Sequence, residues 1–210
     1  MKHCADCKVF ACDSGEDIRP GNCPMRDQEL MSEAVKEYED PEVNRFFVEA
    51  AKIEGEGYGE WNRVRETIEL AKRMGYRDIG IAFCVGFSEE AKTVSRLFEE
   101  RGFTVHSVVC KNGSFDKTLF GIPEEAKVDP GFEPACNPVG QARFLADEGV
   151  ELAIVLGLCV GHDSLFYKYF SRYSDAFVTT LVVKDRALGH NPCVALYQAD
   201  GYMKNTFGDK

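Results

Sequence analysis

The amino-acid sequence predicts an α/β protein, with a mainly parallel sheet of about five strands that is covered by helices. From residue 61 onward, short apolar runs alternate with amphipathic stretches of helical length, which is the pattern of parallel strands joined by crossover helices. In addition, two stretches of the sequence have the same pattern: residues 79–90, IGIAFCVGFSEE, and residues 154–165, IVLGLCVGHDSL. Each has an apolar run, then Cys-Val-Gly, then polar residues that suit the start of a helix.

These two stretches belong to a longer internal repeat. Residues from about 61 to 111 and from about 136 to 186 are both expected to fold as helix–strand–helix–strand. The two segments align without a gap at the separation of Cys84 from Cys159. Few positions are identical, but the register is continuous across all four elements. We therefore expect two related halves within an α/β domain that covers residues 61–210.

The first 26 residues are expected to form a small segment that is held by a metal. They contain few apolar side chains, and such a segment cannot repay the entropy of ordering without a covalent or metal link. They also contain four cysteines in the spacing C-x2-C-x4-C-x10-C, namely Cys4, Cys7, Cys12 and Cys23. Zinc and a [4Fe–4S] cluster both accept four cysteines. The proline after the last cysteine is typical of ferredoxin motifs and favours iron–sulfur.

Residues 27–60 are expected to form a helical linker. Apolar residues recur at helical spacing up to Asp40, where the following proline breaks the helix because the residue before proline avoids helical geometry. A second helix is expected over residues 41–52. The glycines in residues 53–60 indicate a loop.

The α/β domain should contain four main helices and five strands. The expected helices cover residues 61–74, 88–101, 138–148 and 163–173. The expected strands cover residues 79–83, 103–109, 151–158, 176–183 and 193–199. Residues 111–135 separate the two halves as a long loop, and a loop of this length in a compact domain is usually functional or acts as a lid.

Three cysteines of the α/β domain directly follow predicted strands: Cys84, Cys110 and Cys159. The carboxyl ends of parallel strands lie at one edge of the sheet, which is also where such folds bind ligands. Cys136 comes at the end of the long loop, which can fold it over the same edge. We expect these four thiols to hold a second metal centre, most plausibly an iron–sulfur cluster, because thiolates are the ligands that soft metals prefer.

Two other interpretations of these cysteines stay open. Cys84 or Cys159 stands at a strand–helix turn, where the helix end lowers a thiol pKa, and would be a nucleophile with His162 or His190 as its base. Alternatively, each cysteine is a small apolar side chain that packs in the core. Packing is favoured for Cys193, which lies inside a predicted strand.

Cations and histidines accompany the predicted thiol site. Lys111 and Arg186 occupy equivalent places in the two halves, just after a strand. We expect them to bind an anionic substrate or cofactor, or to offset the charge of a cluster. His162, His190 and Cys193 are further candidates for ligands or for groups that support the ligands.

Composition and charge limit the cellular setting. The formal net charge of −10 argues against nucleic acid or an anionic membrane as the main partner. No apolar run has the length of a membrane span, and the first residues, MKHCADCKVF, lack the hydrophobic stretch of a secretion signal. Nine cysteines fit metal ligands or reactive thiols better than disulfides in a reducing compartment. We expect a cytoplasmic protein.

The set of motifs resembles a family of uncharacterised bacterial and archaeal proteins, found largely in anaerobes and described only as metal-binding proteins with a domain of unknown function. The resemblance rests on the four N-terminal cysteines with Pro24, on GIAFCVGFSEEA, on Cys-Asn-Pro at residues 136–138, on LGLCVGHDSLF and on TTLVVKDRALGHNPC. These motifs span most of the chain. The resemblance implies metal binding and an anaerobic setting, and it implies no particular reaction.

The leading hypothesis from the sequence is a metal-binding protein with two thiolate sites, both suited to iron–sulfur clusters. Two such centres suit electron transfer or the reduction of a small molecule, with a small-molecule substrate or an electron-transfer partner. One alternative is a thiol-dependent enzyme or redox sensor whose only metal is a structural zinc. Another is a non-catalytic module that stores or delivers metal.

Overall fold

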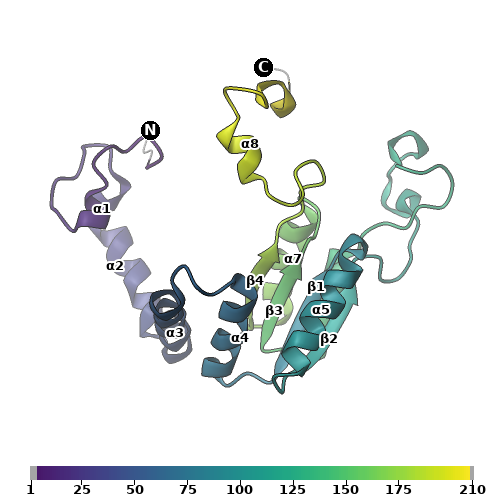
Figure 1. The fold of residues 1–210 in the computed structure, drawn as a ribbon, viewed down its shortest axis with the longest axis horizontal. Coiled ribbons are helices and arrows are strands. Elements are labelled where there is room, and N and C mark those ends of the chain that lie inside the picture. The colour runs from purple at the N-terminus through teal and green to yellow at the C-terminus, as the bar shows by residue number, and fades with distance from the viewer. Residues whose placement is uncertain (1–3, 209–210) are drawn as a thin grey trace. The chain divides into compact units, whose positions relative to one another are not determined.

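A computed structural model describes residues 4–208 of the chain (Figure 1). The chain divides into two units between Tyr58 and Gly59. The first unit is helical, with the elements α1 (Ala11–Ser14), η1 (Pro24–Arg26), α2 (Gln28–Lys36), η2 (Glu37–Glu39) and α3 (Pro41–Gly57).

The helices of the first unit begin at side-chain caps. The carboxylate of Asp27 accepts a hydrogen bond from the backbone N–H of Leu30 and so starts α2, and Asp40 caps α3 in the same way. The loop predicted over residues 53–60 is wrong in its first half, because α3 continues to Gly57. The apolar stripe of α3 continues through Ile53, which is 4% exposed, and its burial outweighs the modest helical cost of glycine.

The second unit confirms the predicted α/β class. Its elements are α4 (Arg63–Met74), β1 (Asp78–Phe83), η3 (Val85–Phe87), α5 (Ser88–Glu99), β2 (Thr104–Val109), η4 (Lys117–Phe120), η5 (Glu124–Ala126), α6 (Pro138–Asp147), β3 (Leu152–Leu156), α7 (His162–Tyr173), β4 (Phe177–Val182), α8 (Cys193–Tyr197) and η6 (Lys204–Phe207). The order helix–strand–helix–strand occurs twice, over α4 to β2 and over α6 to β4.

All strand pairs in the sheet are parallel, and the strand order is β2-β1-β3-β4. The first strands of the two halves, β1 and β3, therefore lie side by side at the centre. From them the chain moves outward to β2 on one side and to β4 on the other. The boundary between β1 and β3 is a topological switch point, and the residues that follow these strands meet there.

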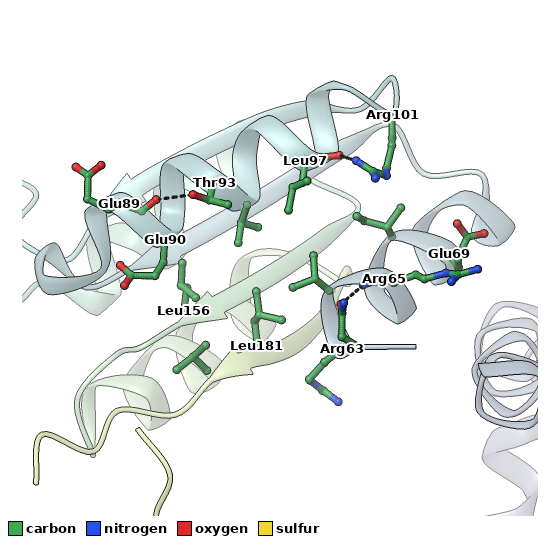
Figure 2. Close-up of a pocket in the computed structure, with 15 residues that line it drawn as sticks. Arg63, Arg65, Glu69, Glu89, Glu90, Thr93, Leu97, Arg101, Leu156 and Leu181 are labelled. Carbon is green, nitrogen blue, oxygen red and sulfur yellow. Dashed lines mark hydrogen bonds between the residues drawn. The ribbon is translucent and has the colours of Figure 1, made fainter. Parts of the chain in front are cut away.

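Helices cover the sheet on both faces. Helices α4 and α5 lie over one face (Figure 2), and right-handed crossovers place α6 and α7, which contact each other, over the opposite face. Helix α6 packs closely because β1 has Gly80 at the contact, where an added Cβ would approach Val150 and Leu145 to 3.0 and 3.1 Å. The core between these layers holds large apolar side chains such as Phe98, Phe166 and Phe170, all fully buried.

The fifth strand, predicted over residues 193–199, is wrong. This segment contains the short helix α8, and the sheet in the described part of the chain has four strands. The apolar residues that suggested a strand are exposed: Leu196 is 65% and Tyr197 is 80% accessible. Within residues 4–208 no strand pairs with this segment, and a local helix satisfies its backbone hydrogen bonds instead. Cys193 is accordingly exposed and not packed inside a sheet.

An apolar groove of about 950 Å³ lies between α4 and α5 (Figure 2). Its floor includes Leu156, Leu181 and Val182 from β3 and β4. Charged residues of the two helices rim it, with Glu89 and Glu90 at the beginning of α5. Across residues 4–208, none of the helices combines the length and apolar character that a bilayer crossing demands.

Candidate cysteine site

Cys84 and Cys110 extend the sheet by one residue beyond β1 and β2. Phe83 and Val109 are the last paired residues of these strands. The backbone N–H of Cys110 donates to the carbonyl of Phe83 at 2.8 Å, so the ladder continues past the last pair. Cys84 and Cys110 are thus neighbours across two strands, whose ordinary separation is about 4.8 Å.

Cys136 joins the same row from the end of the long loop. The backbone N–H of Asn137 donates to the carbonyl of Cys110 at 2.7 Å, which holds the end of the loop next to Cys110. The side chain of Asn112 reinforces this contact, because its amide donates to the carbonyl of Asn137 at 2.9 Å. The sequence Cys-Asn-Pro therefore ties the loop to the sheet edge and then starts α6, whose first turn is capped by Asn137.

Cys110 interacts with both Cys84 and Cys136, and its sulfur accepts a hydrogen bond from the backbone N–H of Val85 at 3.4 Å. Cys110 is 2% exposed and Cys84 is 5% exposed, whereas Cys136 is only partly buried. We call these three residues the thiol row. A thiol has one proton, so Cys110 can donate to only one neighbour at a time.

The two outer thiols of the row are acidic. A hydrogen bond from Cys110 lowers the pKa of Cys84 to about 5, with help from the Lys184 ammonium, whose Nζ lies 2.7 Å from the sulfur. A second hydrogen bond involving Cys110 lowers the pKa of Cys136 to about 4, and the imidazole of His162 adds to this effect. Both residues therefore ionise more readily than an ordinary thiol.

The central thiol behaves in the opposite way. Its hydrogen bonds to Cys136 and Cys84, together with burial, raise the pKa of Cys110 far above its ordinary value, because ionisation would place three negative sulfurs in contact. The thiolate of Cys136 in turn raises the pKa of His162. Cys110 therefore keeps its proton more readily than the two outer thiols do.

Two buried polar atoms beside the thiol row make no hydrogen bond: Oε1 of Gln141 and Nδ1 of His162. The amide nitrogen of Gln141 donates to the carbonyls of Phe83 and Val108, at 3.1 and 2.8 Å, and so fixes the ends of β1 and β2. The sequence reasoning missed Gln141. Its position on the apolar face of α6, in line with Leu145, is the signal that would have identified it.

Cys159 has a different environment. Its sulfur accepts a hydrogen bond from a guanidinium nitrogen of Arg186 at 3.0 Å, and its carbonyl accepts from the N–H of His162 at the start of α7. Cys110 interacts with Cys84 and Cys136, while the described side-chain contact of Cys159 is with Arg186, and the metal centre expected from all four cysteines stays a prediction. Among residues 4–208, no three His, Cys, Asp or Glu side chains are placed to hold one metal ion together.

The predicted cations lie near the thiols, and the structure adds one. The ammonium of Lys111 donates to the carbonyl of Pro134 at 2.5 Å and helps to stabilise the Cys136 thiolate. Arg186 holds Cys159. Lys184, which contacts Cys84, was not among the predicted residues. Its position directly after a strand, like that of Lys111, is the sequence signal that would have identified it.

His190 does not contact the thiol row. Its ring packs against Phe87 with 4.5 Å between the ring centroids, and its Nδ1 accepts a hydrogen bond from the backbone of Asp185 at 3.1 Å. These contacts give it a role in holding the loop after β4. Cys193 lies in α8 and is exposed.

Three of the four N-terminal cysteines line one cavity. Cys4, Cys7 and Cys23 line a common cavity of about 240 Å³. The sulfur of Cys7 accepts a hydrogen bond from the N–H of Phe10 at 3.4 Å. Cys12 lies in α1 and is exposed.

The fold and the thiol row define a three-layer α/β protein with a cysteine centre at the carboxyl edge of its sheet. The chain belongs to the family described as Protein of unknown function (DUF1847), which it matches over residues 23–181. It is 38% identical over 195 residues to Uncharacterized protein MJ0455 of Methanocaldococcus jannaschii, an alignment that covers 92% of this chain and 93% of the relative. No solved structure matches the chain significantly.

Proposed function

We propose that this chain is a metal-binding protein whose main site is the thiol row Cys84, Cys110 and Cys136. The observation that carries the proposal is the meeting of the three cysteines at one sheet edge, where the N–H of Val85 donates to the Cys110 sulfur and the N–H of Asn137 donates to the Cys110 carbonyl. One proton can neutralise only part of the charge that these three neighbouring sulfurs develop. A thiophilic metal that replaces this proton would neutralise all three, and thiolates are the form in which cysteine binds metals.

The residues fit a metal, with some rearrangement of side chains. In a tetrahedral site with Zn–S bonds of about 2.3 Å, neighbouring sulfurs lie about 3.8 Å apart, which is close to a sulfur hydrogen-bond contact. The three sulfurs now lie in a row, so Cys84 and Cys136 would have to turn toward a common centre. Cys159 is the candidate for a fourth ligand, and it would have to leave Arg186.

Lys184, Lys111 and His162 all lie against the thiol row. Their positive charge would offset the net negative charge of a centre bound by several thiolates, whether an iron–sulfur cluster or zinc. We propose that they offset this charge, and that Lys111 and Arg186 also attract anionic substrates.

The N-terminal cysteines are proposed to hold the second centre. Cys4, Cys7 and Cys23 already share a cavity, and Cys12 would complete a four-cysteine site by moving toward it. Two centres in one chain suit electron transfer or the reduction of a small molecule. The N-terminal centre would then exchange electrons with an external partner.

Anaerobic purification with metal and sulfide analysis tests the proposal. We expect iron and acid-labile sulfide with visible absorbance in the wild-type protein. Cys110→Ser should lose the centre of the α/β domain, and Cys23→Ser the N-terminal centre, so each retains about half of the iron. Cys193→Ser is the matched control, because Cys193 is exposed in α8, and it should retain all of the iron.

Other outcomes separate the competing functions. A colourless protein with one zinc and no iron would contradict the two-cluster proposal and support a thiol enzyme or sensor with a structural zinc. Full metal loading with no redox change across the accessible potential range would favour storage or delivery. Unchanged iron in Cys110→Ser would remove the thiol row from the set of ligands.

A further inference from the structure

We infer that the long loop, residues 111–135, binds the groove between α4 and α5 of a second copy of this chain. This self-association goes beyond metal binding and does not depend on which metal the protein holds. The inference rests on the inverted packing of the loop, on the size and lining of the groove, and on the opposite charges of the two surfaces.

The interior of the long loop is polar and charged. The side chain of Lys127 is only 1% exposed, and its ammonium pairs with the carboxylates of Asp116 and Glu124 at 3.1 and 2.7 Å. The carboxylate of Asp116 also accepts hydrogen bonds from the backbone N–H groups of Thr118 and Glu133, both at 2.9 Å. This network holds the loop in one conformation, because a covered charge is costly unless it keeps its partners.

The exterior of the same loop is apolar, which reverses the usual arrangement of a folded chain. The loop extends away from the sheet (Figure 1). Its exposed large apolar side chains include Leu119 at 68%, Phe120 at 56%, Val128 at 82% and Phe132 at 65%. Single exposed apolar residues are ordinary, but several on one short, internally bonded loop indicate a binding surface. A loop that is already held rigid loses little conformational entropy when it binds.

The groove between α4 and α5 is a suitable receptor for such a loop. Its volume of about 950 Å³ lies at the upper end of the range for sites that enclose a bound group, and Leu156, Leu181 and Val182 form an apolar floor. The residues that line the groove come from α4, α5, β3, β4 and positions next to them, so the chain's own long loop does not fill it. The apolar loop and the apolar groove therefore both face solvent in a single copy.

The two surfaces carry opposite charges. Glu125 and Asp129 are exposed acidic residues of the long loop, close to its apolar side chains. Arg65 and Arg101 line the groove at the end opposite the acidic first turn of α5 (Figure 2). We expect the loop to bind with its acidic residues toward these arginines and its apolar residues over the floor. Complementary charges of this kind fix the orientation of a contact and speed its formation.

A second copy of the chain is the occupant that these observations favour, because one chain carries both complementary surfaces. The loop and the groove are different surfaces, so the contact between two copies is heterologous. Two molecules close the arrangement as a dimer when each places its loop in the groove of the other. Where this geometry does not close, the same contact produces longer assemblies.

Sedimentation velocity of the full chain over a series of micromolar concentrations tests the inference. The mass of the wild-type protein should rise above that of a monomer as the concentration increases. Leu119→Asp and Val128→Asp in the loop, and Arg101→Glu in the groove, should each weaken the association roughly tenfold or more, as for central side chains of an interface. Leu196→Asp in α8 and Arg143→Glu on α6 are the matched controls. Leu196 is 65% exposed, close to the value for Leu119, and both controls should associate as wild type.

A mixture of two defective variants tests whether the loop meets the groove. Leu119→Asp retains an intact groove, and Arg101→Glu retains an intact loop. The two variants together should therefore associate more strongly than either variant alone. Circular dichroism of each variant checks that it is folded. If Arg101→Glu does not fold, Arg65→Glu takes its place in both experiments.

Several results would overturn the inference. One is a wild-type protein that stays monomeric up to its solubility limit. Another is weakened association in the loop variants with wild-type association in the groove variant, because the loop would then bind a different surface. A mixture that associates no better than its separate components also contradicts the contact. Binding of a monomeric wild type to phospholipid vesicles, lost in Leu119→Asp, would assign the exposed side chains to a membrane instead.

Discussion

Single contacts set the chemistry of individual thiols in this protein. Cys84 and Cys110 are adjacent and similarly buried, yet the pKa of Cys84 is lowered and that of Cys110 is raised. The difference in pKa arises from the groups that each thiol contacts. Cys84 accepts hydrogen bonds from Cys110 and Lys184, while Cys110 lies between two sulfurs that ionise more readily than it does. Burial alone would have raised the pKa of both.

At this scale we predict the effect of Lys184→Met on Cys84. The substitution removes the ammonium that lies 2.7 Å from the Cys84 sulfur, so the pKa of Cys84 should rise above its value of about 5. The rise should be partial, because the hydrogen bond from Cys110 has the larger effect and is retained. Ultraviolet absorbance of the thiolate across a pH series measures the change. Lys168→Met, on the exposed side of α7, should leave the titration unaltered.

The packing of elements at the sheet edge depends on the loop between β3 and α7. Gly157 begins this loop with a φ of +65°, and its N–H donates to the carbonyl of Val182 at 2.8 Å. The buried ring of Phe87, from η3, lies directly over its α-carbon. The connections that follow β1 and β3 are therefore fitted together at the switch point of the sheet, next to Cys84.

We therefore expect Gly157→Ala to be strongly destabilising. Its methyl group would overlap the Phe87 ring, and alanine disfavours this positive φ, which together should cost about 3 kcal/mol or more. Gly149→Ala is the matched control, because Gly149 has a similar φ of +69° but open space around its α-carbon. It should lose only about 1–2 kcal/mol. Urea unfolding compares the two, and equal losses would show that the contact with Phe87 is unimportant.

The whole molecule couples its stability to the ionisation of the thiol row. Cys84 and Cys136 have pKa values of about 5 and about 4, against an ordinary value of 9.0 for a thiol. Their stabilising effect is complete above pH 9 and is lost as the pH falls toward these lower values. His162 acts in the opposite direction, since its raised pKa stabilises the fold below pH 6.5 and this contribution is lost as the pH rises through the folded-state pKa.

For metal-free, reduced protein we predict that the free energy of unfolding rises between pH 7 and pH 9. In this pH range the stabilisation gained from Cys84 and Cys136 is larger than the stabilisation lost from His162. Above pH 9 the free energy should fall again, because the unfolded chain ionises at Cys110 while the folded chain keeps that proton. Urea unfolding at a series of pH values provides the measurement. Cys136→Ser should flatten the rise, and a flat wild-type profile would show that the thiols are protonated in the fold.

The sequence by itself was sufficient for the class of fold and for the order of its elements. Helical and strand periodicity depend on local burial, so residues 61–183 could be assigned from their pattern, and Cys84 and Cys110 could be placed at strand ends. The assignments from the sequence pattern were wrong where the apolar or polar character of the residues does not match their burial in the fold. In residues 193–199 the apolar side chains are exposed, and in residues 53–57 a glycine-containing helix continues because Ile53 is buried.

Only the tertiary structure decided how the cysteines are grouped. The path of residues 111–135 carries Cys136 back to Cys110, and this path is fixed by contacts between residues far apart in the chain, such as Asn112 with Asn137. The repeat suggested that Cys84 and Cys159 are equivalent, but Cys84 contacts Lys184 and Cys159 contacts Arg186. Local sequence determines where a side chain leaves the backbone, whereas its neighbours, and with them its pKa and reactivity, depend on how the loops close in space.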